Sequence, residues 1–104
     1  MNKLDDILMV LAHPARREAL RLIDQSGEIC LCEILEEVDV PQPNMSRHMG
    51  MLLRSGLVID QREGRRVLYR RKRHLSADIV RLIDAVLSVA DETAAASTDK
   101  ELAS

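Results

Sequence analysis

Two cysteines separated by a single residue, Cys30 and Cys32, are the side chains in this sequence best suited to chemistry, and they are its only cysteines. Thiolates bind soft ions such as cadmium, lead, antimony and bismuth, and thiols at positions i and i+2 converge if the turn that follows them opens. Three interpretations stay open at this point: a soft-ion site, a redox-active pair, and cysteines that simply fill the core.

The start of the chain gives no sign of export. The segment MNKLDDIL becomes acidic and polar directly after its single Lys, which is not typical of a secretory signal. No apolar run approaches the ~18 residues that cross a bilayer. We therefore expect a cytoplasmic protein in a reducing compartment, where Cys30 and Cys32 are free thiols or ligands rather than a structural disulfide.

Positive charge gathers in the middle of the chain. Nine of the fifteen Lys and Arg residues fall within residues 41–75, which contain only two acidic residues, while residues 1–40 and 76–104 are acidic overall. A basic centre between acidic ends predicts one electropositive face. Such a face is either a solvated surface or a surface that binds nucleic acid.

Apolar residues at helical spacing predict the elements that must position these side chains. The predicted helices cover residues 4–12, 14–26, 32–38, the segment from Met45 to Ser55, and 76–91. A short extended segment at 28–30 precedes the third helix, and a tight turn at 40–43 follows it. Two helices joined by a short turn, with polar side chains early in the second, predict a helix-turn-helix.

A hairpin follows the helix-turn-helix. The β-prone runs 57–62 and 65–70 meet at Glu63-Gly64, where Gly64 supplies the positive φ that such turns need. The expected fold is therefore mainly α with a small β-hairpin, a winged helix-turn-helix.

The length of the chain suits one domain, and the composition of the expected core predicts a partner subunit. We expect a DNA-binding and dimerisation domain over 1–92 and a disordered tail over 93–104. The chain has no Phe or Trp, so aliphatic side chains and five Met must fill a core of limited area. The last helix is apolar on more than one side. We therefore expect a homodimer that packs through its first and last helices.

The second helix of a helix-turn-helix enters the major groove with its N-terminal residues against base edges, where amide, hydroxyl and guanidinium groups can each pair with bases. The candidate base-reading residues are Gln42, Asn44, Ser46, Arg47 and His48. Arginines on a two-stranded ribbon contact phosphates or the minor groove. The candidates for backbone contacts are Arg54 on the same helix and Arg62, Arg65 and Arg66 on the hairpin.

Three blocks of the sequence resemble the ArsR/SmtB family of metal- and metalloid-responsive repressors. LAHPARREALRLI (11–23) is similar to the family's first conserved block, PQPNMSRHMGMLLRSGLV (41–58) to its recognition helix, and QREGRRVLYR (61–70) to its wing. The resemblance implies a homodimeric repressor that binds double-stranded operator DNA at a palindrome, with no membrane association and no enzymatic activity.

The segment GEICLCEIL (27–35) resembles the thiol motif C-x-C-x-x-C of arsenite-responsive members, with Leu35 at the position of the third thiol. Arsenite prefers three sulfur ligands, whereas a monomethylated arsenical needs only two thiolates. The resemblance thus implies As(III) or a methylated trivalent arsenical as the inducer, bound by Cys30 and Cys32, and no permanent cofactor. It leaves open whether a small thiol, water, a His or nothing takes the third position.

The leading hypothesis is a repressor of an arsenic-resistance operon that leaves DNA when trivalent arsenic binds. The alternatives are a repressor that senses another soft ion (Sb, Bi, Cd or Pb) or thiol redox state, a winged-helix regulator without a ligand, and a module whose basic face binds an acidic protein. An enzyme is not expected, because no His lies near the thiols in sequence and nothing resembles an oxyanion site.

Overall fold

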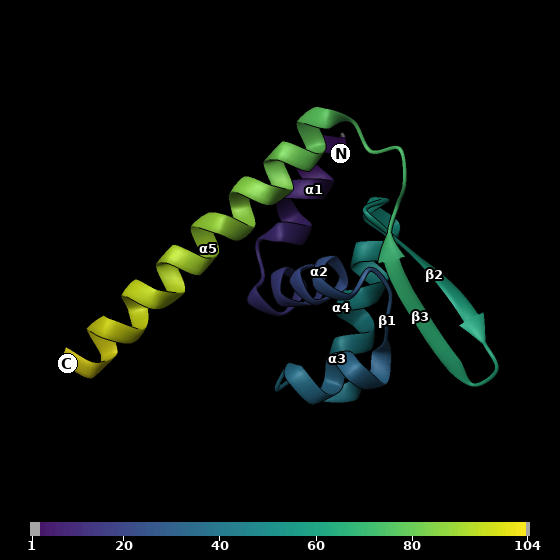
Figure 1. Ribbon diagram of the computed structural model, residues 1–104, viewed down its shortest axis with the longest axis horizontal. Helices are drawn as coiled ribbons and strands as arrows, with labels where there is room; N and C mark the ends of the chain where they lie inside the picture. Colours follow the sequence, from purple (N-terminus) through teal and green to yellow (C-terminus); the bar gives the residue numbers. More distant parts are fainter. Residues whose placement is uncertain (1–2, 104) are drawn as a thin grey trace. The chain divides into compact units, whose positions relative to one another are not determined.

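The computed structural model describes the backbone of residues 3–103 and the side chains of residues 3–93. Its elements, in chain order, are α1 (Lys3–Leu11), α2 (Pro14–Ser26), β1 (Ile29–Cys30), α3 (Leu31–Glu37), α4 (Gln42–Ser55), β2 (Val58–Glu63), β3 (Arg66–Arg71) and α5 (Ala77–Ala103) (Figure 1). They form two compact units, Met1–His74 and Leu75–Ser104. Among the helices of this described part, none is both long and apolar enough to span a bilayer. The predicted fold class, mainly helical with a small antiparallel sheet, is confirmed.

Helix α2 has the bounds that the sequence predicted, because both of its ends carry local signals. Pro14 stands in the first turn, where a missing N–H costs nothing. The Nδ1 atom of His13 accepts a hydrogen bond from the Ala15 N–H at 3.0 Å and caps the helix. At the other end Gly27 adopts a φ of 79° and donates its N–H to the Ile23 carbonyl at 2.7 Å.

Helix α4 begins at Gln42, inside the segment 40–43 that was expected to be a tight turn. The prediction of a tight turn was wrong for residues 42 and 43, because a proline such as Pro43 is well tolerated in the first turn of a helix. Pro41 is the residue before the helix, and its carbonyl accepts the Met45 N–H at 2.9 Å. The shift places Gln42 and Asn44 on the first turn of α4, where the DNA-reading hypothesis needs them.

The sheet has three strands in the order β1-β3-β2, all antiparallel. The pairing of Glu63 with Arg66 leaves Gly64 and Arg65 as the two loop residues, so the turn lies one residue later than expected. Gly64 has a φ of 65°, which suits the first position of such a loop. Strand β1 was expected only as an extended segment; its pairing with β3, Cys30 opposite Leu68, joins the cysteine segment to the hairpin.

The core of the first unit is aliphatic, as the composition requires. Helix α4 contacts α1, α2 and α3. The largest side chains of this unit that are fully buried are Ile7, Leu20, Ile23, Ile34, Met45, Met49, Leu52, Leu57, Val58 and Cys30. Each buried aliphatic side chain of this size contributes about 1.5–3 kcal/mol relative to an exposed one.

The second unit is the single helix α5. Ser76 caps it, because its Oγ accepts the Ile79 N–H at 3.2 Å. The helix runs from Ala77 to Ala103, past the expected end near residue 91. The predicted disordered tail, residues 93–104, lies almost wholly outside the residues whose side chains are described, and it stays a prediction.

A buried arginine holds α1, α2 and α4 together. Arg16 is 7% exposed, and it donates from Nε to the Val10 carbonyl at 2.7 Å and from Nη2 to the Met9 carbonyl at 3.0 Å. These carbonyls belong to the last turn of α1, which carries partial negative charge, and the Met9 carbonyl also accepts the Ala12 N–H at 3.2 Å. The remaining nitrogen, Nη1, lies 3.1 Å from His48 Nδ1 on α4. Since a guanidinium can only donate, His48 Nδ1 is the acceptor.

The surroundings of His48 disfavour its charged form. Burial lowers the pKa of His48, and the nearby His13, Arg16 and Arg47 lower that pKa further. The His13 and His48 ring centroids are 4.3 Å apart. A neutral His48 accepts the Arg16 hydrogen bond, whereas a protonated His48 cannot.

We expect the stability of the fold to fall in mild acid because of His48. Its pKa is lower in the folded chain than the ordinary value of about 6.5, so protonation favours the unfolded chain. The contribution is complete above about pH 6.5 and is lost as the pH falls through that value toward the lowered pKa. Urea denaturation from about pH 7.5 to pH 5 should show a larger loss in the native chain than in His48→Gln, whose amide oxygen can still accept from Arg16. Equal losses in the two proteins would contradict this assignment.

Candidate nucleic-acid interface and thiol site

The outer face of α4 carries four of the predicted base-reading residues. Their side chains are exposed, while Met45, Met49 and Leu52 fill the inner face of the same helix. Arg47 Nη2 donates to Asn44 Oδ1 at 3.1 Å, so these two side chains are held side by side. The four exposed residues are Gln42, Asn44, Ser46 and Arg47.

His48 lies elsewhere than expected. It is only partly exposed and faces Arg16 and His13 rather than standing with the exposed side chains of α4. The reason is its spacing, since His48 adjoins the stripe formed by Met45, Met49 and Leu52. The geometry therefore favours a supporting role for His48 over base contact.

Arg16, which supports His48, was missed in the sequence. The only local signal for it is its position within the apolar stripe of α2, between the buried Ala15 and Ala19. Arg54, predicted to contact the DNA backbone, is exposed on the last turn of α4.

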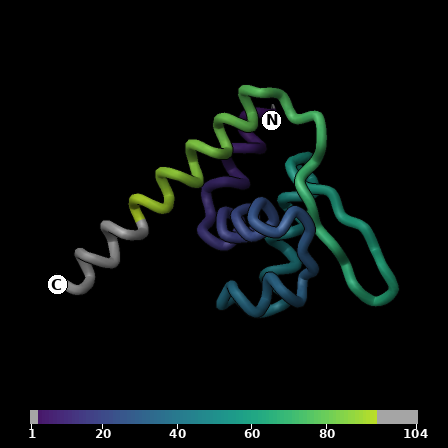
Figure 2. The backbone as a smooth tube through the Cα atoms, viewed as in Figure 1, coloured from purple at the N-terminus to yellow at the C-terminus, as the bar shows by residue number. Residues whose placement is uncertain are grey.

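The β2–β3 hairpin projects from the helical part of the first unit (Figure 2) and carries the predicted wing arginines on its exposed outer part. Arg65 stands in the two-residue loop at the tip, and Arg62 and Arg66 flank it on the strands. Arg71, the last residue of β3, instead forms an ion pair with Asp24 of α2 at 3.3 Å. That arginine anchors the hairpin, whereas Arg62 and Arg65 on its outer part are exposed, as phosphate contacts require.

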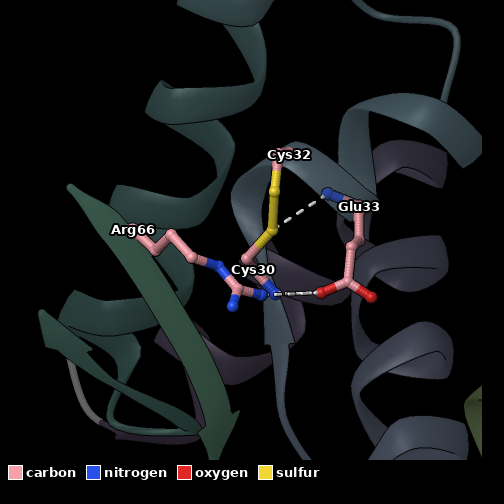
Figure 3. Close-up of a disulfide and its surroundings, with 4 residues drawn as sticks. All are labelled: Cys30, Cys32, Glu33 and Arg66. Carbon is pink, nitrogen blue, oxygen red and sulfur yellow. Dashed lines mark hydrogen bonds and ion pairs between the residues drawn. A yellow bond between two sulfur atoms is a disulfide. The ribbon is translucent and has the colours of Figure 1, made fainter. Parts of the chain in front are cut away.

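Cys30 and Cys32 are joined by a disulfide (Figure 3). The structure therefore differs from the expectation that both cysteines are free thiols. Cys30 is the extended residue before α3 and Cys32 is the second residue of that helix, so the first turn brings their Cα atoms to 5.3 Å. The two sulfurs thus converge without the opening of the turn that the sequence analysis required. Cys30 is 1% exposed, while Cys32 is exposed.

The sulfur of Cys30 also caps α3. Cys30 Sγ accepts the Glu33 N–H at 3.3 Å, and Glu33 Oε1 accepts the Cys30 N–H at 3.2 Å, a reciprocal capping box. The same Glu33 oxygen lies 3.5 Å from Nη2 of Arg66 on β3. Figure 3 shows one carboxylate oxygen of Glu33 in contact with both the Cys30 segment and the Arg66 guanidinium. Glu33 therefore connects the thiol pair to the hairpin.

A hollow of about 320 Å³ lies beside the two cysteines. Its lining comprises Cys30, Leu31, Cys32, Leu35, Gln42, Arg65, Arg66 and Val67. Leu35, at the position of the third thiol in the motif, is part of this wall. The side chains described here contain no group of three or more His, Cys, Asp or Glu that could hold a metal ion. Within this hollow the chain therefore offers two soft ligands and no third.

Comparisons with known proteins agree with the fold. Residues 13–60 match the family model described as "Bacterial regulatory protein, arsR family". The chain is 35% identical over 78 residues to the "Arsenical resistance operon repressor" of Escherichia coli (strain K12), over 75% of this chain and 67% of that protein. It is 37% identical over 87 residues to the "HTH-type transcriptional repressor SmtB" of Mycobacterium tuberculosis (strain H37Rv), over 84% of this chain and 62% of that protein.

A solved structure is also similar. The homodimeric winged helix-turn-helix DNA-binding domain Mb0332 from Mycobacterium bovis superposes with a TM-score of 0.69 at 31% identity, over 88% of this chain and 81% of that one. The matched regions span about two thirds of the length of the two curated relatives. These relatives are transcriptional regulators and not enzymes. The chain therefore belongs to the ArsR family of winged helix-turn-helix transcriptional repressors.

Proposed function

We propose that this chain is a cytoplasmic, metalloid-responsive repressor that binds an operator palindrome as a homodimer. Trivalent arsenic, as arsenite or methylarsenite, binds Cys30 and Cys32 and releases the DNA. The observation that carries the proposal is the convergence of the two sulfurs in a hollow bordered by the recognition helix and the wing. Similarity to the arsenical resistance repressor of Escherichia coli supports the choice of arsenic.

Dimerisation is supported by the outer face of α1. Leu4, Leu8 and Met9 are 54%, 45% and 48% exposed, while Ile7 and Val10 on the other face are buried. Exposed apolar area costs about 25 cal/mol per Å², so a second copy that covers these residues stabilises the chain. Val89 of α5 is exposed as well. A dimer through α1 and α5 sets two α4 helices about one turn of DNA apart, ~34–36 Å.

Ligand binding requires the reduced pair. A thiol reductant supplies two electrons and two protons to the disulfide and leaves as its own disulfide. Each cysteine thiol then loses its proton as its sulfur bonds to arsenic, and one hydroxide per bond leaves arsenic as water. Arsenic stays trivalent throughout.

The consequence for α3 follows from the cap. The cap is formed by a sulfur that is bonded to Cys32, and replacing that bond with one to arsenic moves the sulfur away from the Glu33 N–H. Loss of a cap costs about 0.5–2 kcal/mol. Two subunits together then reach the ~1–3 kcal/mol that typical allosteric coupling requires. The disturbance reaches β3 through the pairing of Cys30 with Leu68 and through the Glu33–Arg66 contact.

A second candidate function is a repressor that responds to thiol redox state. The Cys30–Cys32 disulfide favours it specifically, because oxidation alone would change the atom that caps α3. The two candidates differ in what releases the DNA: arsenic acts on the dithiol, and an oxidant acts without arsenic.

Replacing both cysteines, Cys30→Ser with Cys32→Ser, should preserve DNA affinity and abolish release. Serine is a good N-cap, so α3 still begins at the same place, but a hydroxyl does not hold trivalent arsenic. Fluorescence anisotropy of a duplex from the promoter of its own gene measures both properties, with methylarsenite and arsenite added to the reduced complex. Normal release from the double variant would rule out the thiol site. Release of the native protein by an oxidant, with no effect of arsenic, would select the redox candidate.

Removing two wing arginines, Arg62→Ala with Arg65→Ala, should weaken binding to every duplex alike. Each lost phosphate contact lowers the slope of log affinity against log salt by roughly 0.9. The slope of the double variant should therefore be smaller by roughly 2 than the slope of the native protein. The control is Arg81→Ala, which removes an exposed arginine of α5 and should keep the native slope. An unchanged affinity at low salt would show that the hairpin does not contact DNA.

Glu33→Gln should separate DNA binding from the response to arsenic. The glutamine oxygen still accepts the Cys30 N–H, but the charge that attracts Arg66 is gone. We expect DNA affinity within about threefold of the native value, and an arsenic-induced loss of affinity reduced by about fivefold or more, about 1 kcal/mol of coupling. Glu36→Gln, an exposed change on the same helix, is the matched control. Full release of the Glu33→Gln complex would exclude this path to the wing.

A further inference from the structure

The hollow beside the thiol pair combines two kinds of chemistry. Its lining includes the two sulfur-bearing residues Cys30 and Cys32, and it also includes the cationic residues Arg65 and Arg66 and the amide residue Gln42. Arg65 comes from the tip of the hairpin and Gln42 from the first residue of α4. The volume of about 320 Å³ falls at the lower end of the range of ~300–1,000 Å³ found for sites that bind small organic molecules.

Arsenite prefers one sulfur ligand more than the two cysteines provide, and a small organic thiol is a molecule that can supply it. Arsenite takes three thiolates and this chain provides two, while Leu35 closes the wall where the motif's third thiol would stand. None of the other side chains that line the hollow is a thiol, an imidazole or a carboxylate. The lining of the hollow therefore provides no third sulfur ligand.

The arginines indicate which kind of thiol is accepted. A guanidinium binds a carboxylate through two parallel hydrogen bonds, and it repels an ammonium group. Arg66 already forms an ion pair with Glu33 at 3.5 Å. Arg65 is therefore the cation lining the hollow that is better placed to bind a carboxylate.

We propose that the hollow binds a small thiol that carries a carboxylate: its sulfur completes the coordination of arsenite on Cys30 and Cys32, and Arg65 holds its carboxylate. This inference rests on the proposed arsenite function and names the species that fills the third position. In forming the adduct, three thiols each lose one proton and three hydroxides leave arsenic as three waters. No electron is transferred, because the cysteine pair is already reduced.

The adduct also acts on the wing. A carboxylate bound to Arg65 neutralises a charge that the wing directs at phosphate, so the ligand competes with DNA for the same side chain. The inducer therefore disturbs both the cap of α3 and the charge of the hairpin tip.

The test uses three thiols of similar size and different charge on the full chain without DNA. The chain is first reduced with a phosphine, and arsenite is then titrated in the presence of 3-mercaptopropionate, 2-mercaptoethanol or cysteamine. The arsenic–sulfur absorption band gives the dissociation constant, and native mass spectrometry counts the retained thiol. We expect arsenite to bind about tenfold more tightly with the anionic thiol than with the cationic one, with one anionic thiol kept per site.

Two variants test whether Arg65 is the source of the preference for the anionic thiol. Arg65→Gln removes the charge from the hollow and should reduce the preference to less than about twofold. Arg62→Gln removes a nearby charge that does not line the hollow and should keep the preference. Neither variant changes a sulfur ligand, so both should still bind arsenite.

The outcomes separate this inference from the proposed function. Equal affinities with the three thiols, or a preference that survives Arg65→Gln, would overturn the anionic co-ligand and leave the arsenite site intact. Binding of methylarsenite but not of arsenite would also overturn the co-ligand, because two thiolates then suffice. Failure of both arsenicals to bind with any thiol would overturn the proposed function itself.

Discussion

The start of helix α3 depends on a sulfur atom, and this dependence joins the structure of the protein to its chemistry. Cys30 Sγ accepts the Glu33 N–H, and the residue that carries it pairs with β3 through its backbone. The sulfur is almost wholly buried, so the cap cannot be replaced by water without cost. A change in the bonding of this sulfur, which the structure shows bonded to Cys32, therefore acts on the start of α3 and on strand β3 together.

The recognition helix is held from its inner face, which leaves its outer face free. Methionine and leucine side chains bury that inner face, and Arg16 adds a hydrogen-bonded link from the end of α1 to His48. A buried guanidinium is tolerated here because backbone carbonyls, an imidazole and the Met51 sulfur surround it. The exposed residues of α4 and the arginines of the hairpin are thus presented by a well-packed support.

The sequence predicted those elements whose signals are local. The bounds of α2, the succession of two helices and a hairpin, and the exposure of Arg62 and Arg65 follow from apolar spacing, proline and Gly64. What depends on distant contacts was missed: the pairing of β1 with β3, the burial of Arg16 and the inward position of His48. The first turn of α4 was misplaced for another reason, because a segment with prolines at positions 41 and 43 is compatible both with a tight turn and with the start of a helix. The assignments of Cys30 and Cys32 to arsenic, and of the exposed residues to DNA, stay predictions.

Amide hydrogen exchange in the reduced protein tests the central claim most directly, because it observes the cap itself. If a bond between arsenic and the Cys30 sulfur removes the cap, saturating methylarsenite should speed exchange of the Glu33 N–H by about tenfold, equivalent to about 1.4 kcal/mol. The amides of β3 that face β1 should lose protection as well, whereas those in the middle of α2 should not change. Unchanged or increased protection at Glu33, under conditions in which the ligand still releases DNA, would contradict the account.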